Sequence, residues 1–214
     1  MPSNRPRAEA PPEARPKPVH AGRRRLLAAA AALPAAVAVP SLRAATQGDE
    51  VAALLRGGGV VIAFRHALAP GTFDPPEFRL GDCSTQRNLS DEGRAQARRI
   101  GAWFRERGLA PSSVRSSPWC RCMDTATLAF GTGQAWPALG SPRGSPERTN
   151  AEHLGQLRAA LRGASAQRGR FEVWVTHMFV LADLTGQSSS SGEGLVLRPG
   201  RGDAVDVLAR LAIA

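Results

Sequence analysis

Two runs of apolar residues stand out along the chain, and each of them predicts a buried strand. The first is Val60–Phe64, which follows the glycines at 57–59, and the second is Phe171–Thr176. Short runs rich in Val, Ile and aromatic residues, bounded by turn residues, are typical of strands that are covered on both faces. Shorter segments at 113–116, 195–197 and 204–212 favour further strands, the last of them at a sheet edge.

Apolar positions between these runs recur at helical spacing. From Ser90 to Arg107 they are Ala95, Ala97, Ile100, Trp103 and Phe104. Ser90 suits an N-cap, and Gly108 suits the residue that follows the last helical turn. Further helices are expected at 49–56, from Pro118 onward, from Asn150 through Leu161, and as a turn at 181–184. Segments 67–82, 134–148 and 187–194 are expected to be irregular because proline, glycine and serine interrupt them.

Strands that alternate with helices predict an α/β fold. We expect a single three-layer domain at 46–214, with a mostly parallel central sheet flanked by helices. That length is sufficient for one substantial core. Residues 1–45 are expected to form a separate leader.

Several polar residues follow the predicted strands directly. Arg65 and His66 come after the first apolar run, and His177 comes after the second. The carboxyl ends of parallel strands are where ligands bind in open α/β sheets. A guanidinium beside an imidazole suits an anion, and the imidazole can also act as a nucleophile.

The order of these residues resembles that of the histidine phosphatase superfamily, which includes phosphoglycerate mutases and acid phosphatases. The resemblance rests on Arg65-His66, on the segment 82–94, on the turn at 116–118 that leads to Arg121, and on His177. It extends over roughly residues 60–197 and implies a phosphoglycerate mutase-like fold. It also implies phosphoryl transfer without a metal or other cofactor.

The resemblance implies a role for each of these residues. His66 is the nucleophile, Arg65 and Arg121 hold the phosphoryl group, and a protonated His177 stabilises the phosphoryl oxygens. Asn88 is expected to bind substrate as well. Spacing alone does not separate Arg121 from Arg115, which lies nearer the end of its strand.

The acid that protonates the leaving group is not evident from the sequence. Some relatives place an Asp directly after the second His, where this chain has Met178. The candidates are Glu147, Glu152 and Glu193. Ala67 is a second departure, since many relatives have glycine there, and it requires a negative φ.

The first 45 residues carry the features of an export signal. Six prolines occur within residues 1–22, and Arg23–Arg25 then precede the apolar stretch Leu26–Val39. A basic cluster followed by a short apolar segment is typical of a secretory signal, and adjacent arginines favour the twin-arginine route. Fourteen residues with an internal proline are too short for a membrane span, which needs about 20. We therefore expect a periplasmic or secreted bacterial protein, with the export machinery as a partner and no membrane span after cleavage.

The net charge of +10 could indicate a nucleic-acid-binding protein. However, the leader accounts for +6 of it, with eight basic and two acidic residues, so the domain carries only +4. No nucleic-acid partner is therefore expected. The three cysteines allow one disulfide, of Cys83 with either Cys120 or Cys122, because the resemblance brings those segments near the site. No Cys-x-x-Cys motif occurs, which disfavours a zinc site.

These observations together predict a metal-independent phosphomonoesterase that works through a phosphohistidine on His66. Its substrate is a small phosphorylated molecule, and export favours a phosphosugar of the cell envelope over the cytosolic substrates of a mutase. The alternative is a non-catalytic member of the same fold that binds a phosphate or a phosphoglycan. Ala67 and the missing acid favour that alternative.

Overall fold

A computed structural model describes residues 41–143 and 146–213 of the chain, with side chains described from residue 47 onward. The expected signal segment lies almost wholly outside these residues. None of the helices in the described ranges is both long and apolar enough to cross a membrane.

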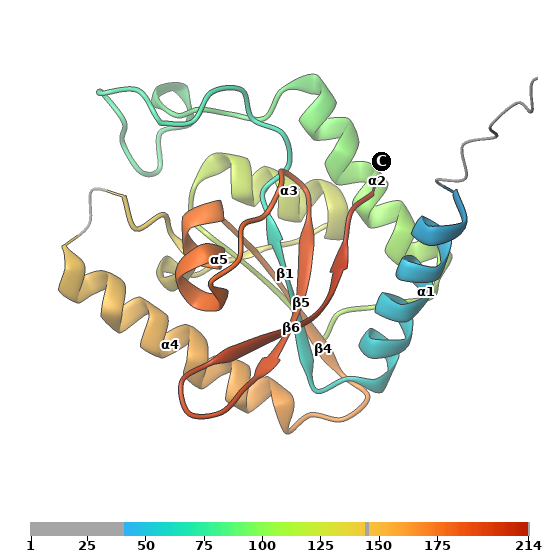
Figure 1. Ribbon diagram of the computed structural model, residues 1–214. Coiled ribbons are helices and arrows are strands. Elements are labelled where there is room, and N and C mark those ends of the chain that lie inside the picture. Colours follow the sequence, from blue (N-terminus) through green and yellow to red (C-terminus); the bar gives the residue numbers. More distant parts are fainter. Residues whose placement is uncertain (1–40, 144–145, 214) are drawn as a thin grey trace, which may run out of the picture. The chain divides into compact units, whose positions relative to one another are not determined.

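The described strands form one six-stranded mixed sheet in the order β3-β2-β4-β1-β5-β6 (Figure 1). Strands β3, β2, β4 and β1 run parallel to one another, whereas β5 pairs antiparallel with both β1 and β6. The bounds are β1 (Val60–Arg65), β2 (Ser113–Ser116), β3 (Gln134–Ala135), β4 (Phe171–Thr176), β5 (Gly194–Pro199) and β6 (Val205–Leu211). The predicted strands are thus confirmed, including the edge position of the last one.

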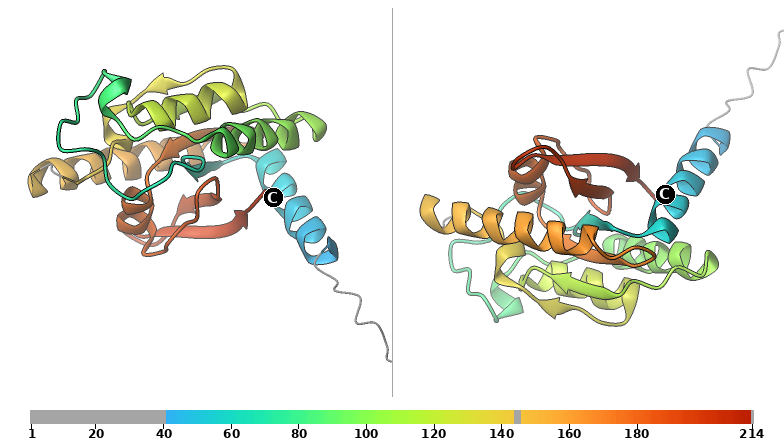
Figure 2. Two further views of the ribbon diagram at one scale, coloured as in Figure 1. Left: turned by 90° about the horizontal axis from the view of Figure 1, so that it is seen from above. Right: turned by 90° about the horizontal axis from the view of Figure 1, so that it is seen from below.

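Helices cover both faces of this sheet (Figure 2). Helices α1 (Ser41–Gly57), α2 (Asp91–Glu106) and α3 (Cys120–Phe130) pack on one face, and α4 (Glu147–Ser165) and α5 (Met178–Thr185) pack on the other. Val60, Ile62 and Phe64 of β1 point into the first core, and Val61 and Ala63 point into the second. Because both faces of β1 are covered, its sequence is continuously apolar. The predicted three-layer α/β class is confirmed.

The start of α2 shows how a local signal positions a loop. The Ser90 Oγ accepts a hydrogen bond from the Gly93 N–H at 3.1 Å, as expected of an N-cap. A Cβ at Gly93 would lie 2.0 Å from the Leu68 carbonyl oxygen, so only glycine lets the helix approach this closely. The first turn of α2 therefore lies against the loop that follows His66.

Several helix boundaries differ from the prediction, including α4, which continues to Ser165, and α5, which begins at Met178. Helix α1 spans Ser41–Gly57, well beyond the expected 49–56. Helix α3 begins at Cys120 rather than at Pro118, with Trp119 as its N-cap. Asn150 does not cap α4, which already begins at Glu147; the preceding Pro146 has a φ of −58° and needs no N–H partner. The Asn150 amide instead donates to the Pro142 carbonyl at 3.3 Å. The described connections also include two short 3-10 helices, η1 (Cys83–Thr85) and η2 (Pro137–Leu139).

Candidate active site

The site lies where the adjacent parallel strands β2, β4 and β1 end together. Arg65 of β1 is paired with Thr176 of β4, and Ser116 of β2 is paired with Val175. The residues that directly follow these strands therefore lie at the same edge of the sheet. They are His66, His177 and Ser117. This is the arrangement that the sequence predicted from the ends of the strands.

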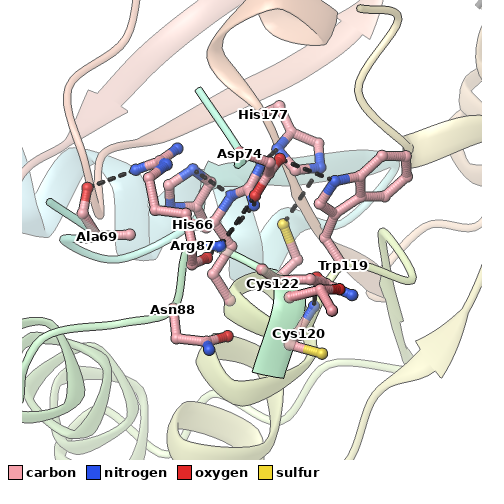
Figure 3. A network of polar contacts seen from close by, with 12 residues as sticks. His66, Ala69, Asp74, Arg87, Asn88, Trp119, Cys120, Cys122 and His177 are labelled. Atoms are coloured by element: carbon pink, nitrogen blue, oxygen red, sulfur yellow. Dashed lines mark hydrogen bonds and ion pairs between the residues drawn. The ribbon is translucent and has the colours of Figure 1, made fainter. Parts of the chain in front are cut away.

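Arg121, in the first turn of α3, contacts both His66 and His177, whose side chains are labelled in Figure 3. Its Nε donates to His66 Nε2 at 3.2 Å, and its Nη2 donates to His177 Nδ1 at 3.3 Å. The imidazole centroids are 5.6 Å apart, and all of these residues are buried. The structure therefore brings together the residues that the sequence selected, although they are far apart along the chain.

The contacts of His66 fix its tautomer. Its Nδ1 donates to the Ala67 carbonyl at 2.8 Å, so the Nε2 that accepts from Arg121 carries the lone pair. Burial, together with the charges of Arg121, Arg87 and Arg65, lowers the pKa of His66 to about 3. The imidazole is therefore neutral near pH 7, as a nucleophile must be.

Ala67 stands where many members of the family that the sequence resembles have glycine, and its backbone is not strained. Among the described residues only glycines have a positive φ, so alanine meets the condition set by the sequence. Its N–H donates to Thr125 Oγ1 at 3.0 Å, and that hydroxyl donates to the Arg121 carbonyl at 2.7 Å. The backbone beside the nucleophile is thus anchored to α3.

The hydrogen bonds of His177 fit a neutral ring, whereas the resemblance implies a proton on it only while it stabilises phosphoryl oxygens. Its Nδ1 accepts from Arg121, so its Nε2 donates to Ser117 Oγ at 2.8 Å. Burial and the neighbouring charge of Arg121 hold the pKa of His177 well below its usual value. A phosphoryl dianion beside the ring would favour its protonation by the opposite effect.

A cavity of about 250 Å³ opens over these residues. Its charged lining residues are Arg65, Arg87, Arg121, Arg143 and Asp74, so positive charge predominates. Arg65 donates from Nη1 to the Ser189 carbonyl at 2.9 Å, and Arg87 Nη1 donates to the Ala69 carbonyl. The Nε groups of Arg65 and Arg87 are buried and have no partner among the described residues. Both guanidinium groups line the cavity, where their positive charge suits a bound anion.

Arg87 was missed by the sequence reasoning, which selected its neighbour Asn88. The Asn88 amide donates to the Cys83 carbonyl at 2.7 Å, and the residue does not line the cavity. The segment was correctly identified, but residue spacing could not show which of two adjacent side chains turns inward. In an irregular segment no periodicity determines that direction.

Asp74 is the second residue that the sequence reasoning missed. Its carboxylate pairs with both terminal nitrogens of Arg121, at 2.7 Å and 3.1 Å. It also accepts from the Arg87 backbone N–H at 3.1 Å and from Trp119 Nε1 at 3.3 Å. Asp74 lies in the loop at 67–82, where the sequence offered no motif.

The glutamates proposed as proton donors lie elsewhere. Glu193 pairs with Arg210 at 2.8 Å, and Glu152 pairs with Arg148 at 3.0 Å on the exposed side of α4. Glu147 is in the first turn of α4, and none of the three lines the cavity. The structure does not bring these carboxylates to the histidines.

Arg115 is also held away from the histidine cluster. Its guanidinium lies 3.6 Å from the Glu172 carboxylate and 4.9 Å from the centroid of the Trp136 ring. The structure thus agrees with the family pattern, which selected Arg121 over Arg115.

Cys83 forms a disulfide with Cys120, one of the two pairings that the sequence left open. The bond links η1 to the residue before Arg121, and the Cys120 N–H also donates to Gln86 Oε1 at 3.0 Å. Cys122 is a buried thiol 3.6 Å from His177 Nε2. Burial raises the pKa of Cys122 to about 12, so it is a thiol rather than a nucleophilic thiolate.

Aromatic rings form one wall of the cavity. The Phe78 ring stacks on Trp119 with centroids 5.5 Å apart, and Arg143 lies 3.5 Å over the Phe73 ring. The polar cluster and the aromatic wall together suit a molecule with an anionic end and a flat or apolar remainder.

Comparison with known proteins agrees with this geometry. Residues 79–139, which include Arg87 and Arg121, match the model of the histidine phosphatase superfamily (branch 1). No curated protein matches the sequence. The fold is similar to that of the protein histidine phosphatase SixA, solved with tungstate, at 17% identity and a TM-score of 0.51 over 72% of this chain and 96% of the other.

Two further solved structures have a fold similar to that of this chain. A putative alpha-ribazole-5′-P phosphatase from Escherichia coli has 14% identity and a TM-score of 0.51, over 72% of this chain and 96% of its own. The product of an open reading frame of Mycobacterium tuberculosis has 15% identity and a TM-score of 0.51, over 70% of this chain and 95% of its own. These likenesses establish a phosphoglycerate mutase-like fold.

Proposed function

We propose that this protein is a metal-independent phosphomonoesterase that forms a phosphohistidine on His66. The observation that carries the proposal is the cluster of His66, Arg121 and His177, in which an unprotonated Nε2 faces a cationic cavity. The family match over residues 79–139 and the phosphatases among the structural neighbours support the same activity.

The arginines neutralise the phosphoryl oxygens in this mechanism. Arg65 and Arg87 line the cavity with their guanidinium groups, and the Arg121 Nε–H turns from His66 to a phosphoryl oxygen. His66 Nε2 then attacks phosphorus, while its Nδ1–H remains bonded to the Ala67 carbonyl. Water hydrolyses the phosphohistidine in a second step. Positioning and charge stabilisation supply most of the catalysis in such transfers.

The substrate that we propose is a small phosphomonoester outside the cytosol, such as a phosphosugar of the cell envelope. The basic and apolar leader supports export by the twin-arginine route, and the Cys83–Cys120 disulfide suits an oxidising compartment. The aromatic wall supports a substrate with a ring next to its phosphate.

A screen of the purified protein tests this proposal. The substrates are phosphorylated sugars, nucleotides, phosphohistidine peptides and 4-nitrophenyl phosphate. We expect turnover, a burst of the first product, and an acid-labile phosphoenzyme that His66→Ala abolishes. Binding of phosphate esters without turnover would instead support a non-catalytic phosphate-binding protein.

A further inference from the structure

A catalytic phosphatase of this kind needs a proton donor for its leaving group, and the cavity offers one carboxyl group. Asp74 is the single acidic residue among the described residues that line it. Its side chain is 17% exposed, so it is open to the cavity but largely shielded from bulk water.

The Arg121 guanidinium contacts the two histidines along one edge and Asp74 along the adjacent edge. The edge formed by Nε and Nη2 faces His66 and His177, while the edge formed by Nη1 and Nη2 faces Asp74. A phosphoryl group bonded to His66 and in contact with His177 lies along the first edge. Asp74 then occupies the neighbouring edge of the same guanidinium, beside the group that reacts.

Two further donors hold the Asp74 carboxylate in this place. The Arg87 backbone N–H binds one of its oxygens, and Trp119 Nε1 binds the other. Both donors belong to segments that line the cavity. The carboxylate is thus fixed by contacts that a solvent-exposed loop acid would not have.

We propose that Asp74 donates the proton that the leaving oxygen requires, an inference that rests on the function proposed above. A phosphoryl dianion on Arg121 competes with the Asp74 carboxylate for the same guanidinium. As His66 Nε2 bonds to phosphorus, the bond from phosphorus to the ester oxygen breaks and its electron pair stays on that oxygen. The oxygen takes the Asp74 proton and leaves as an alcohol.

The second half of the reaction returns the proton to Asp74. The carboxylate removes a proton from water as the water oxygen attacks phosphorus. The bond from phosphorus to His66 Nε2 breaks, and its electron pair returns to the imidazole. The products are inorganic phosphate, neutral His66 and a protonated Asp74, so atoms and charges balance.

The test is Asp74→Asn measured on a series of aryl phosphates of similar size, from 4-nitrophenyl phosphate to phenyl phosphate. The nitrophenolate leaves well without a proton, whereas the phenolate does not. We expect kcat/KM to fall at least about tenfold more for phenyl phosphate than for 4-nitrophenyl phosphate, because general acid catalysis assists the poorer leaving group more. Glu77→Gln, an exposed acid of the same loop, is the matched control and should leave both values unchanged.

The outcomes separate this inference from the proposed function. An equal loss for every aryl phosphate would overturn it, since Asp74 would then only position Arg121. The wild-type protein gives a second measurement should the variant not fold: a steep dependence of kcat/KM on leaving-group acidity would show that no proton is donated. If wild-type turnover requires His66 but one of these two results is found, the role of Asp74 is wrong and the proposed function stands. Absence of any turnover and of any phosphoenzyme would overturn both proposals.

Discussion

At the scale of single residues, His66 is positioned so that one nitrogen is a permanent donor and the other a permanent acceptor. We expect His66→Ala to lower kcat/KM by at least about a thousandfold, because the variant has no atom to accept the phosphoryl group. His153→Ala, in α4 and outside the main cavity, should leave kcat/KM unchanged. Steady-state kinetics with circular dichroism as a folding check measures both. Residual activity well above a thousandth in a folded His66→Ala variant would contradict covalent catalysis.

Arg121 in α3 and Arg115 in the preceding strand β2 offer a matched pair of variants. Arg121→Ala removes the guanidinium that contacts both histidines, so we expect a loss of activity nearly as large as that of His66→Ala. Arg115→Ala removes a pairing with Glu172 far from the histidines and should change kcat/KM less than about threefold. The reverse order in kcat/KM would show that the wrong arginine had been assigned.

The depressed pKa of His66 also predicts how stability depends on pH. The unfolded chain binds a proton on this residue below about pH 6.5, whereas the folded protein binds it only below about pH 3. The free energy of unfolding should therefore fall as pH decreases between these values, by up to about 1.4 kcal/mol per pH unit from His66 alone. Urea unfolding at several pH values between about 7 and 5 measures the slope. His66→Asn should make it shallower by that amount; an unchanged slope would show that His66 titrates normally.

At the scale of elements, the disulfide links η1 to the first residue of α3. Its loss opens a loop closed by residues 37 apart, which should lower the free energy of unfolding by roughly 3–4 kcal/mol. Because Cys120 precedes Arg121, we also expect kcat/KM to fall in the Cys83→Ser/Cys120→Ser double variant. Thermal melts and kinetics measure both effects. A reducing agent should affect the wild type but not the double variant; equal effects on both would assign the change to another group.

The elements also show which features a sequence reveals. Strands β1 and β4 were predictable because burial on both faces demands continuous apolar residues, and the polar residues after them then mark the strand ends. Asp74, Arg87 and Asn88 lie in irregular segments, where no periodicity fixes the direction of a side chain. The start of α4 was misplaced because Asn150 resembles a cap, although the chain already turns at Pro146.

At the scale of the whole molecule, guanidinium groups supply the positive charge that lines the cavity. The described part of the chain contains no group of three or more His, Cys, Asp or Glu side chains placed to hold a metal ion. Because arginines, rather than a metal ion, neutralise the phosphoryl group in the proposed mechanism, we expect an excess of chelator to leave kcat/KM unchanged in a dialysed sample. Inhibition that added zinc or magnesium reverses would point to a metal in the reaction.

The distribution of charge leads to a further expectation for the whole chain. The first 45 residues carry +6 of the net +10, so any affinity for nucleic acid should belong to them. The full chain and a version lacking these residues can be compared for DNA binding at low salt. Tight binding by the shortened protein would contradict this interpretation.

The burial of His66 has opposite effects in acid on the protonation of its imidazole and on the stability of the fold. An ordinary surface imidazole becomes charged and inert in a mildly acidic medium, but this one retains its lone pair down to about pH 3. The same shielding makes the native state less favourable there, because the unfolded chain gains protons that the folded protein excludes. As the surroundings acidify, the native structure should therefore become less stable while the imidazole of His66 remains neutral.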